Sequence, residues 1–225
     1  MSILSRKLPH IAATGALLMA ASSLTYAAEK TYKVTITNIT KSIAFTPFIA
    51  ATHNKATDFY SVGEPASEEL AALAEGGDVV PLMDTLLVNH RVNDIETTEG
   101  LLQPGNSVSF TITTAPGARF FSTAAMLLPT NDTFVGLDTV RLPLRGKATF
   151  YAHAYDAGSE MNDELCISIP GPTCGGEGVS AGEDDEGYVY PSPGIHGEGD
   201  LSTATYNWQG PVAKVTIKTV HQRYK

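Results

Sequence analysis

Three carboxylates stand in two turns, each of which follows an apolar run of strand-forming residues. Asp132 lies in the turn after 121–128, and Asp156 and Glu160 lie in the turn after 148–155. If the two runs belong to one sheet, the turns share an end of it and the three side chains converge. Converging carboxylates repel one another unless protons or a cation neutralise them, and calcium prefers oxygen ligands. The spacing therefore predicts a calcium site.

The ordinary alternative is a pair of solvated turns, because Asp is common in turns for its local hydrogen bonds. Calcium takes about six to eight oxygens, so three side chains do not fill its shell. Backbone carbonyls, water, and Asn131, Asp138 or Asn162 would have to complete it. Gly158 allows the tight turn between Asp156 and the last carboxylate.

Most of the segments that must position these turns have the pattern of β-strands. Seven segments show alternating polarity or a high content of β-branched and aromatic residues. They are 31–39, 43–51, 107–113, 120–128, 137–144, 148–155 and 212–220. Proline cannot donate to a sheet, so Pro47 predicts an edge position or a bulge. The predicted fold class is all-β, an antiparallel β-sandwich.

A helical insertion over 66–90 interrupts this pattern. The segment 67–74 is rich in strong helix formers and is followed by a pair of glycines. Asp78 can cap a second short helix over 80–88. We expect both helices to pack across one sheet.

The N-terminal residues 1–27 have the features of a secretory signal peptide: a short basic start, an apolar run over 11–21 and a small-residue end. An uncleaved anchor is the alternative, but the apolar run is shorter than the span of about 20 residues that a membrane helix needs. We therefore expect an exported mature domain over 30–225, without a transmembrane segment after cleavage.

The two cysteines, Cys166 and Cys174, follow this predicted export signal. In an oxidising compartment they are expected to form a disulfide that closes a short loop, with paired zinc ligands as the alternative. They open a Gly/Pro-rich and acidic loop over 166–200, with its carboxylates concentrated in 177–200. Its acidic run at 183–186 lacks the spacing of a calcium-binding helix-loop-helix and predicts solvated, flexible charge.

The charge and the missing motifs exclude several functions. The formal net charge is −9 and falls to −11 when the predicted signal peptide, with Arg6 and Lys7, is removed. This charge disfavours nucleic-acid binding and unaided binding to anionic lipid.

The common nucleophile, zinc-protease and phosphate-loop motifs are absent from the sequence. His53 is expected to be a hydrogen-bonded structural residue. The sequence predicts a protein that is not an enzyme; a secreted hydrolase or a purely structural envelope protein is the alternative.

Two motifs resemble the spondin domain in a bacterial exported form. They are Met-Leu-Leu-Pro with Asp-Thr-Phe-Val-Gly at 126–136, and Tyr-Asp-Ala-Gly-Ser-Glu at 155–160. The stretches 48–53 and 63–68 add to the resemblance, which covers roughly 30–220. It implies a β-sandwich similar to calcium-dependent lipid-docking modules, with a calcium site at Asp132, Asp156 and Glu160. The chain departs from the animal pattern at Thr133, where Trp is usual, and at Glu160, where Asp is usual.

Together these features predict an exported calcium-binding β-sandwich that acts as an adhesion or binding module. The expected location is the periplasm, the cell surface or the extracellular space. The partner can be a glycan, a lipid head group or another protein, and the sequence does not choose among them.

Overall fold

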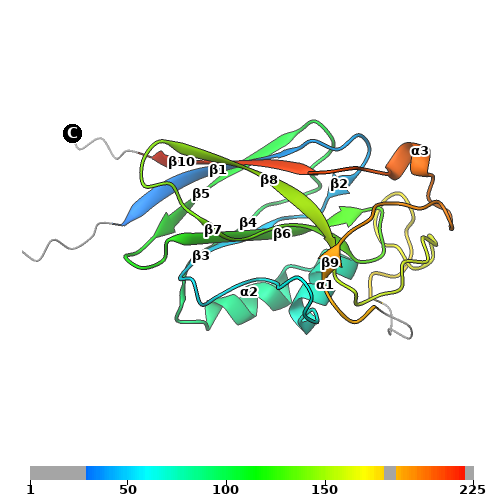
Figure 1. The fold of residues 1–225 in the computed structure, drawn as a ribbon, viewed down its shortest axis with the longest axis horizontal. Coiled ribbons are helices and arrows are strands. Elements are labelled where there is room, and N and C mark those ends of the chain that lie inside the picture. Colours follow the sequence, from blue (N-terminus) through cyan, green and yellow to red (C-terminus); the bar gives the residue numbers. More distant parts are fainter. Residues whose placement is uncertain (1–28, 180–185, 221–225) are drawn as a thin grey trace, which may run out of the picture.

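The computed structural model describes residues 29–179 and 186–220, and Figure 1 shows two sheets packed face to face with helices beneath the lower one. The strands are β1 Lys30–Asn38, β2 Ala44–Phe45, β3 Ile49–His53, β4 Val92–Thr97, β5 Ser107–Thr114, β6 Phe120–Leu128, β7 Thr133–Arg141, β8 Lys147–Asp156, β9 Tyr190–Pro191 and β10 Ala213–Val220. The helices are α1 Glu68–Gly76, α2 Val80–Leu87 and α3 Thr203–Tyr206. The predicted all-β sandwich with a helical insertion is confirmed.

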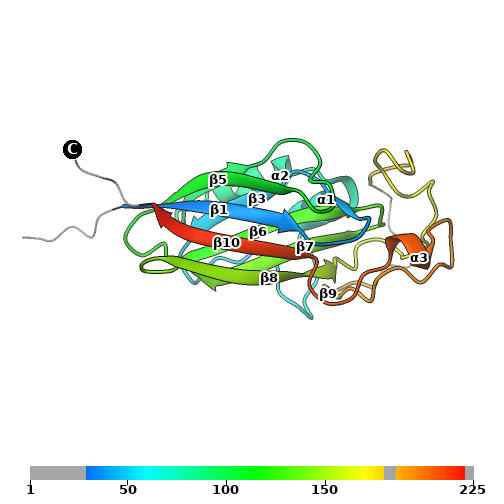
Figure 2. The same cartoon turned by 90° about the horizontal axis from the view of Figure 1, so that it is seen from above.

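Strand β8 connects the two layers. The strand order is β4-β3-β6-β7-β8-β10-β1-β5, and the pairings between neighbouring strands are antiparallel. The first half of β8 pairs with β10 in the upper layer, and its second half pairs with β7 in the lower layer. Figure 2 looks onto the outer face of β5, β1, β10 and β8, with α1 and α2 behind the other sheet.

The far edges of the two sheets meet through side chains of β4. Asp94 Oδ2 accepts from the Thr113 N–H at 2.7 Å, and Asn93 Oδ1 accepts from the Ala115 N–H at 2.9 Å. These bonds join β4 to β5 and nearly close the sheet, which protects both edges from pairing with other chains.

The core lies between the layers, and the helices add a second apolar layer. Inward residues of β1 such as Val34 and Ile36 are fully buried, as their alternation predicts. Strand β6 has apolar residues on both faces because it lies between two apolar layers. Phe121 belongs to the central core, and Ala124 belongs to the cluster that contains Leu70 of α1.

The helical insertion forms as predicted. Ser67 caps α1 by accepting from the Leu70 N–H at 3.2 Å, and Gly77 ends the helix at φ 68°. Asp78 accepts from the Val80 N–H at 2.9 Å, but it lies one residue before Val79, the N-cap residue of α2, so it is not the helix cap that the sequence predicts. Figure 1 shows both helices covering the outer face of the lower sheet.

Two of the predicted strands differ from the structure by more than one residue. Pro47 divides the predicted 43–51 strand into β2 and β3, in keeping with its missing N–H. The predicted 137–144 strand is shifted, since β7 begins at Thr133 and ends at Arg141. It begins earlier because Thr133 pairs with Asp156, and it ends before Pro143.

The segment after β8 is partly anchored to the sandwich. The predicted disulfide Cys166–Cys174 is formed, with an S–S distance of 2.04 Å. It packs with Ile169, Ile195 and Leu201 in a small apolar cluster. Strand β9 pairs with β8, and the sequence did not predict α3. The predicted signal peptide 1–27 lies outside the described residues, as do 180–185 and 221–225.

Candidate functional site

The antiparallel register of β7 and β8 brings Asp132 and Asp156 to one end of the sheet. Thr133 is paired with Asp156, so Asp132 lies one residue beyond the pair. The Ala157 N–H donates to the Asp132 carbonyl oxygen at 3.2 Å and extends the pairing into the turns. Both carboxylates are fully buried, with 0% of each residue exposed. The two turns therefore share an end, as the sequence predicts.

Three of the four carboxylate oxygens accept hydrogen bonds, two of them from backbone N–H groups and one from a side-chain amide. Asp132 Oδ2 accepts from the N–H groups of Ser159 at 2.9 Å and Glu160 at 3.2 Å. Asp156 Oδ1 accepts from the Gly158 N–H at 2.9 Å, and its Oδ2 accepts from Asn162 Nδ2 at 2.8 Å. These bonds fix the orientation of both carboxylates.

The turn depends on glycine at position 158. Its φ of 64° lies in the left-handed region, and a Cβ atom there would lie 2.8 Å from the Tyr188 backbone nitrogen and still closer to the Tyr188 carbonyl oxygen. Any other residue would push the 187–190 segment away from the carboxylates.

The fourth oxygen, Asp132 Oδ1, is buried and has no hydrogen-bond partner within the described part of the chain. Buried polar atoms are rarely left in this state, because each loses its hydration without compensation. The arrangement thus leaves one carboxylate oxygen that a proton or a cation would satisfy.

Burial is the main reason why the pKa values of this pair are high. It raises the pKa of Asp132 from 3.8 to about 8, with a further contribution from the Asp156 charge and opposition from the Ser159 and Glu160 N–H bonds. Burial also raises the pKa of Asp156, against the bonds from Asn162 and Gly158. Without a cation, the pair therefore retains a proton near neutral pH.

The third predicted ligand, Glu160, is buried beside the pair and contributes its N–H to Asp132. Within 29–179 and 186–220, no three His, Cys, Asp or Glu side chains are arranged to hold a metal ion by themselves. The structure brings together two of the three predicted carboxylates, and any metal ion would need further oxygens.

Only one of the three suggested additional ligands lies at this site. Asn162 contacts Asp156, whereas Asn131 bonds to Asp163 and to the Glu164 N–H. Asp138 lies elsewhere and accepts from Ser122 Oγ at 2.8 Å and the Phe59 N–H at 2.7 Å.

Sequence reasoning missed two residues that the loop brings to the pair. Asn162 Nδ2 donates to Glu186 Oε1 at 3.2 Å and contacts the Tyr190 hydroxyl at the same distance. The Glu186 charge contributes to the raised pKa of both aspartates. Burial is the main reason why the pKa of Tyr190 is raised, and the negative charges of Asp156, Glu186 and Asp132 raise it further. The acidic run at 183–186 was the available signal, and at Glu186 it is not merely solvated charge.

Another buried carboxylate, Glu164, organises the neighbouring loop. It accepts from the N–H groups of His196, Gly197 at 2.6 Å and Glu198 at 3.0 Å. Its carbonyl oxygen accepts from the Asp200 N–H at 2.8 Å. Nothing in the irregular sequence around it distinguished Glu164 in advance, because its partners lie about thirty residues away in the chain.

His53 has the structural role that the sequence predicts. It is fully buried, and its two ring nitrogens lie 2.7 Å from the Asn54 carbonyl oxygen and 2.8 Å from Ser122 Oγ. Ser122 in turn donates to Asp138. Ser122 stands between the histidine and the aspartate, so the group lacks the order of a catalytic triad, in which the histidine is central.

Comparison with known proteins agrees with this architecture. The Spondin_N family model matches residues 25–163, which contain both aspartate turns. No curated protein matches the chain. No helix in the described residues is long and apolar enough to cross a membrane. The match covers more than half of the sequence, and the chain therefore belongs to the spondin N-terminal domain family, an assignment that indicates an exported module for extracellular binding or adhesion.

Proposed function

We propose that this protein is an exported binding or adhesion module whose Asp132–Asp156 end binds calcium. The family, the sandwich and the disulfide support the exported binding module. Calcium binding and the location, which would be the periplasm, the cell surface or the extracellular space, are parts of the proposal.

The observation that carries the calcium proposal is the unpartnered Asp132 Oδ1 beside a second buried carboxylate. A hard cation is bound by such oxygens, and its charge would replace the shared proton of the pair. Asp132 and Asp156 would hold it, with Glu160 as the third carboxylate that the sequence predicts, Glu186 as one that bonds to Asn162, and backbone carbonyls and water completing the shell.

The chain's own contacts indicate what this end would do. Gly158, Glu186 and Tyr190 connect the aspartate turns to the segment that leads into β9, through the Gly187 N–H bond to the Gly158 carbonyl oxygen at 2.9 Å. Neutralising the aspartates would remove the repulsion that opposes this closed arrangement. A rigid loop end is what a binding module needs to present a partner surface without a large ordering cost.

The proposal is for binding and not for catalysis. Ser122 and His53 are fully buried, and with Asp138 they stand in the wrong order for nucleophile activation. The aspartate pair is also fully buried, a setting that suits a small cation better than a bulky substrate.

Terbium luminescence tests the site directly, because Tyr190 lies at the aspartates and can transfer its excitation to a bound lanthanide. We expect terbium emission on excitation of tyrosine, and its displacement by calcium with a dissociation constant of roughly 0.1–1 mM. Asp156→Asn should abolish both. Asp84→Asn, on the exposed face of α2, is the matched control and should retain both. Equal terbium emission from wild type and Asp156→Asn would place the ion elsewhere.

A further inference from the structure

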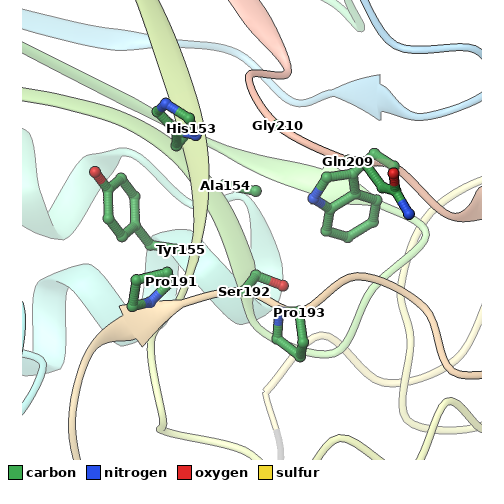
Figure 3. Close-up of a pocket in the computed structure, with 9 residues that line it drawn as sticks. His153, Ala154, Tyr155, Pro191, Ser192, Pro193, Gln209 and Gly210 are labelled. Atoms are coloured by element: carbon green, nitrogen blue, oxygen red, sulfur yellow. The ribbon is translucent and has the colours of Figure 1, made fainter.

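A pocket opens where β8 leaves one sheet for the other. Ala152 is still paired with Ala213 of β10, whereas Tyr155 is paired with Pro191 of β9. Between these two pairs, the side of β8 at Ala154 has no neighbouring strand. The split forms a pocket of about 380 Å³, within the usual size range of small-ligand sites. In Figure 3, Ala154 lies above Ser192 and Pro193, with Gln209 to its right.

The lining of this pocket is aromatic and polar but not charged. None of its nine residues is Asp, Glu, Lys or Arg, although the chain has 24 acidic and 15 basic residues. Trp208 and Tyr155 supply aromatic ring surface. Ser192, Gln209 and His153 supply groups that donate and accept hydrogen bonds. Such a lining offers no Asp, Glu, Lys or Arg partner to an ionic ligand and fits one with both apolar faces and hydroxyl groups.

An extended peptide is a poor fit, because β8 offers little free backbone here. The Ala152 carbonyl oxygen accepts from the Val212 N–H at 2.9 Å, and the Ala154 carbonyl oxygen accepts from the Ser192 N–H at 3.1 Å. A peptide that adds a strand needs such groups for its ladder. By contrast, the side chains of His153 and Gln209 make no hydrogen bond to any described residue, so they are available to a ligand.

We propose that this pocket binds a neutral saccharide. The C–H face of a sugar ring packs against an aromatic ring, here the half-buried Trp208, while its hydroxyls act as both donors and acceptors toward Gln209, His153 and Ser192. The negative net charge of the chain further disfavours acidic glycans. The inference rests on the proposed binding role and names its ligand class.

The surface beside the pocket favours an oligosaccharide over a single sugar. A second hollow of about 350 Å³ shares His153 and Tyr155 with the first and adds Tyr60, Tyr151 and one carboxylate, Asp138, which can accept from sugar hydroxyls. Every second residue of β8 points to the same face of the sheet. The row on this face consists of Tyr151, His153 and Tyr155, and it runs across both hollows. A chain of sugar rings can follow this row.

The pocket is a feature of this chain beyond the family match. Six of its nine residues come from 191–193 and 208–210, after the matched region ends at residue 163. It also adjoins the aspartate end, because Asp156 and Tyr190 form the pair next to Tyr155 and Pro191. The segment that closes the pocket is thus the one that the aspartate turns position.

The test uses the fact that Trp208 is the single tryptophan of the chain, so its fluorescence reports on this pocket alone. The mature protein is titrated with cellohexaose, maltohexaose and chitohexaose, with hexaproline as the peptide comparison. We expect at least one hexasaccharide to change the tryptophan emission, with saturation at a concentration of about 1 mM or below. Hexaproline should cause no such change.

Isothermal titration calorimetry then compares variants. Trp208→Ala should weaken binding about tenfold or more, and Gln209→Ala, which leaves the packing of Trp208 intact, several-fold. Gln103→Ala, an exposed glutamine outside the pocket, should bind as wild type does. Binding of hexaproline but no saccharide, no binding of any probe, or unchanged affinity in both pocket variants would each overturn the proposal.

All titrations are repeated in chelator and in millimolar calcium, which separates this inference from the calcium site. Saccharide binding together with a failed terbium experiment retains the pocket and removes the calcium proposal. Terbium binding with no saccharide response retains the calcium proposal and removes the saccharide pocket.

Discussion

Replacing Asp132 by asparagine removes the most costly carboxylate at the aspartate end while retaining its shape. In the absence of a cation, the folded protein holds a proton on Asp132 up to a pKa of about 8, whereas the unfolded chain releases it near 4. Folding therefore takes up a proton between these values, and the free energy of unfolding falls as pH rises from about 4 to about 8. The substituted amide needs no proton, so the contribution of Asp132 to this pH dependence should be lost in Asp132→Asn.

The size of the effect follows from that difference in pKa. At pH 7, about three pH units above the unfolded pKa, the proton uptake costs roughly 4 kcal/mol at about 1.4 kcal/mol per unit. The amide accepts less strongly from the Ser159 and Glu160 N–H groups, which offsets part of the gain. We expect Asp132→Asn to be about 2 kcal/mol more stable than wild type in chelator, or roughly 4–8 °C in Tm.

Calcium should stabilise the wild-type protein but not Asp132→Asn. With a dissociation constant near 0.1 mM, about 1 mM calcium stabilises wild type by roughly 1.4 kcal/mol, or about 3–6 °C. Asp132→Asn should gain nothing, so calcium narrows the difference in stability between the two proteins. Asp84→Asn serves as the control for removing a negative charge elsewhere.

The assay is thermal and urea unfolding followed by circular dichroism, at several pH values between 4 and 8, in chelator and in calcium. The reasoning is refuted if Asp132→Asn is less stable than wild type in chelator at pH 7, because the carboxylate would then be ionised and stabilised by its backbone donors. A calcium shift of equal size in both proteins would refute the ligand assignment.

Three further substitutions test other parts of this end. Gly158→Ala should cost about 2 kcal/mol or more in urea unfolding and weaken terbium binding, because a Cβ atom forces the Tyr188 backbone away; a wild-type melt would show that the turn tolerates a side chain. Glu164→Gln should cost roughly 1.5–3 kcal/mol and speed hydrogen exchange of the amides that it accepts from, since these bonds lose their charge; unchanged exchange would contradict the anchoring role. Replacing Cys166 and Cys174 by serine should lower the unfolding free energy by about 2–3 kcal/mol, the chain-entropy value for so short a loop, and a melt equal to that of wild type would exclude this contribution.

Local patterns in the sequence were sufficient for most of the elements. Alternation along β1, β5 and β10 predicts their buried faces because side chains in a strand alternate with a period of two. Ser67 and Gly77 define the two ends of α1, because capping depends on nearby residues. The start of β7 was not predicted, because Thr133 belongs to a strand only through its pairing with Asp156.

The candidate site was predicted in part. The two aspartate turns share an end, as the spacing of the apolar runs indicates, but the sequence did not reveal that Asp132 Oδ1 lacks a partner. It also did not place Glu186 and Tyr190, which the 166–200 loop returns to the aspartates. Loop segments carry no periodic signal, so their partners are set by the closed chain path and not by neighbours in sequence.

The sequence by itself determined the class of the protein: a sandwich of antiparallel strands with a capped helical insertion, a pair of cysteines able to bond, and two acidic turns. These follow from interactions within about ten residues, which side-chain periodicity and turn chemistry control. The tertiary structure alone decided that β8 passes from one sheet to the other, since strand pairing depends on residues far apart in the chain. That passage places the aspartate pair at one end of β8 and opens the Trp208 pocket beside it.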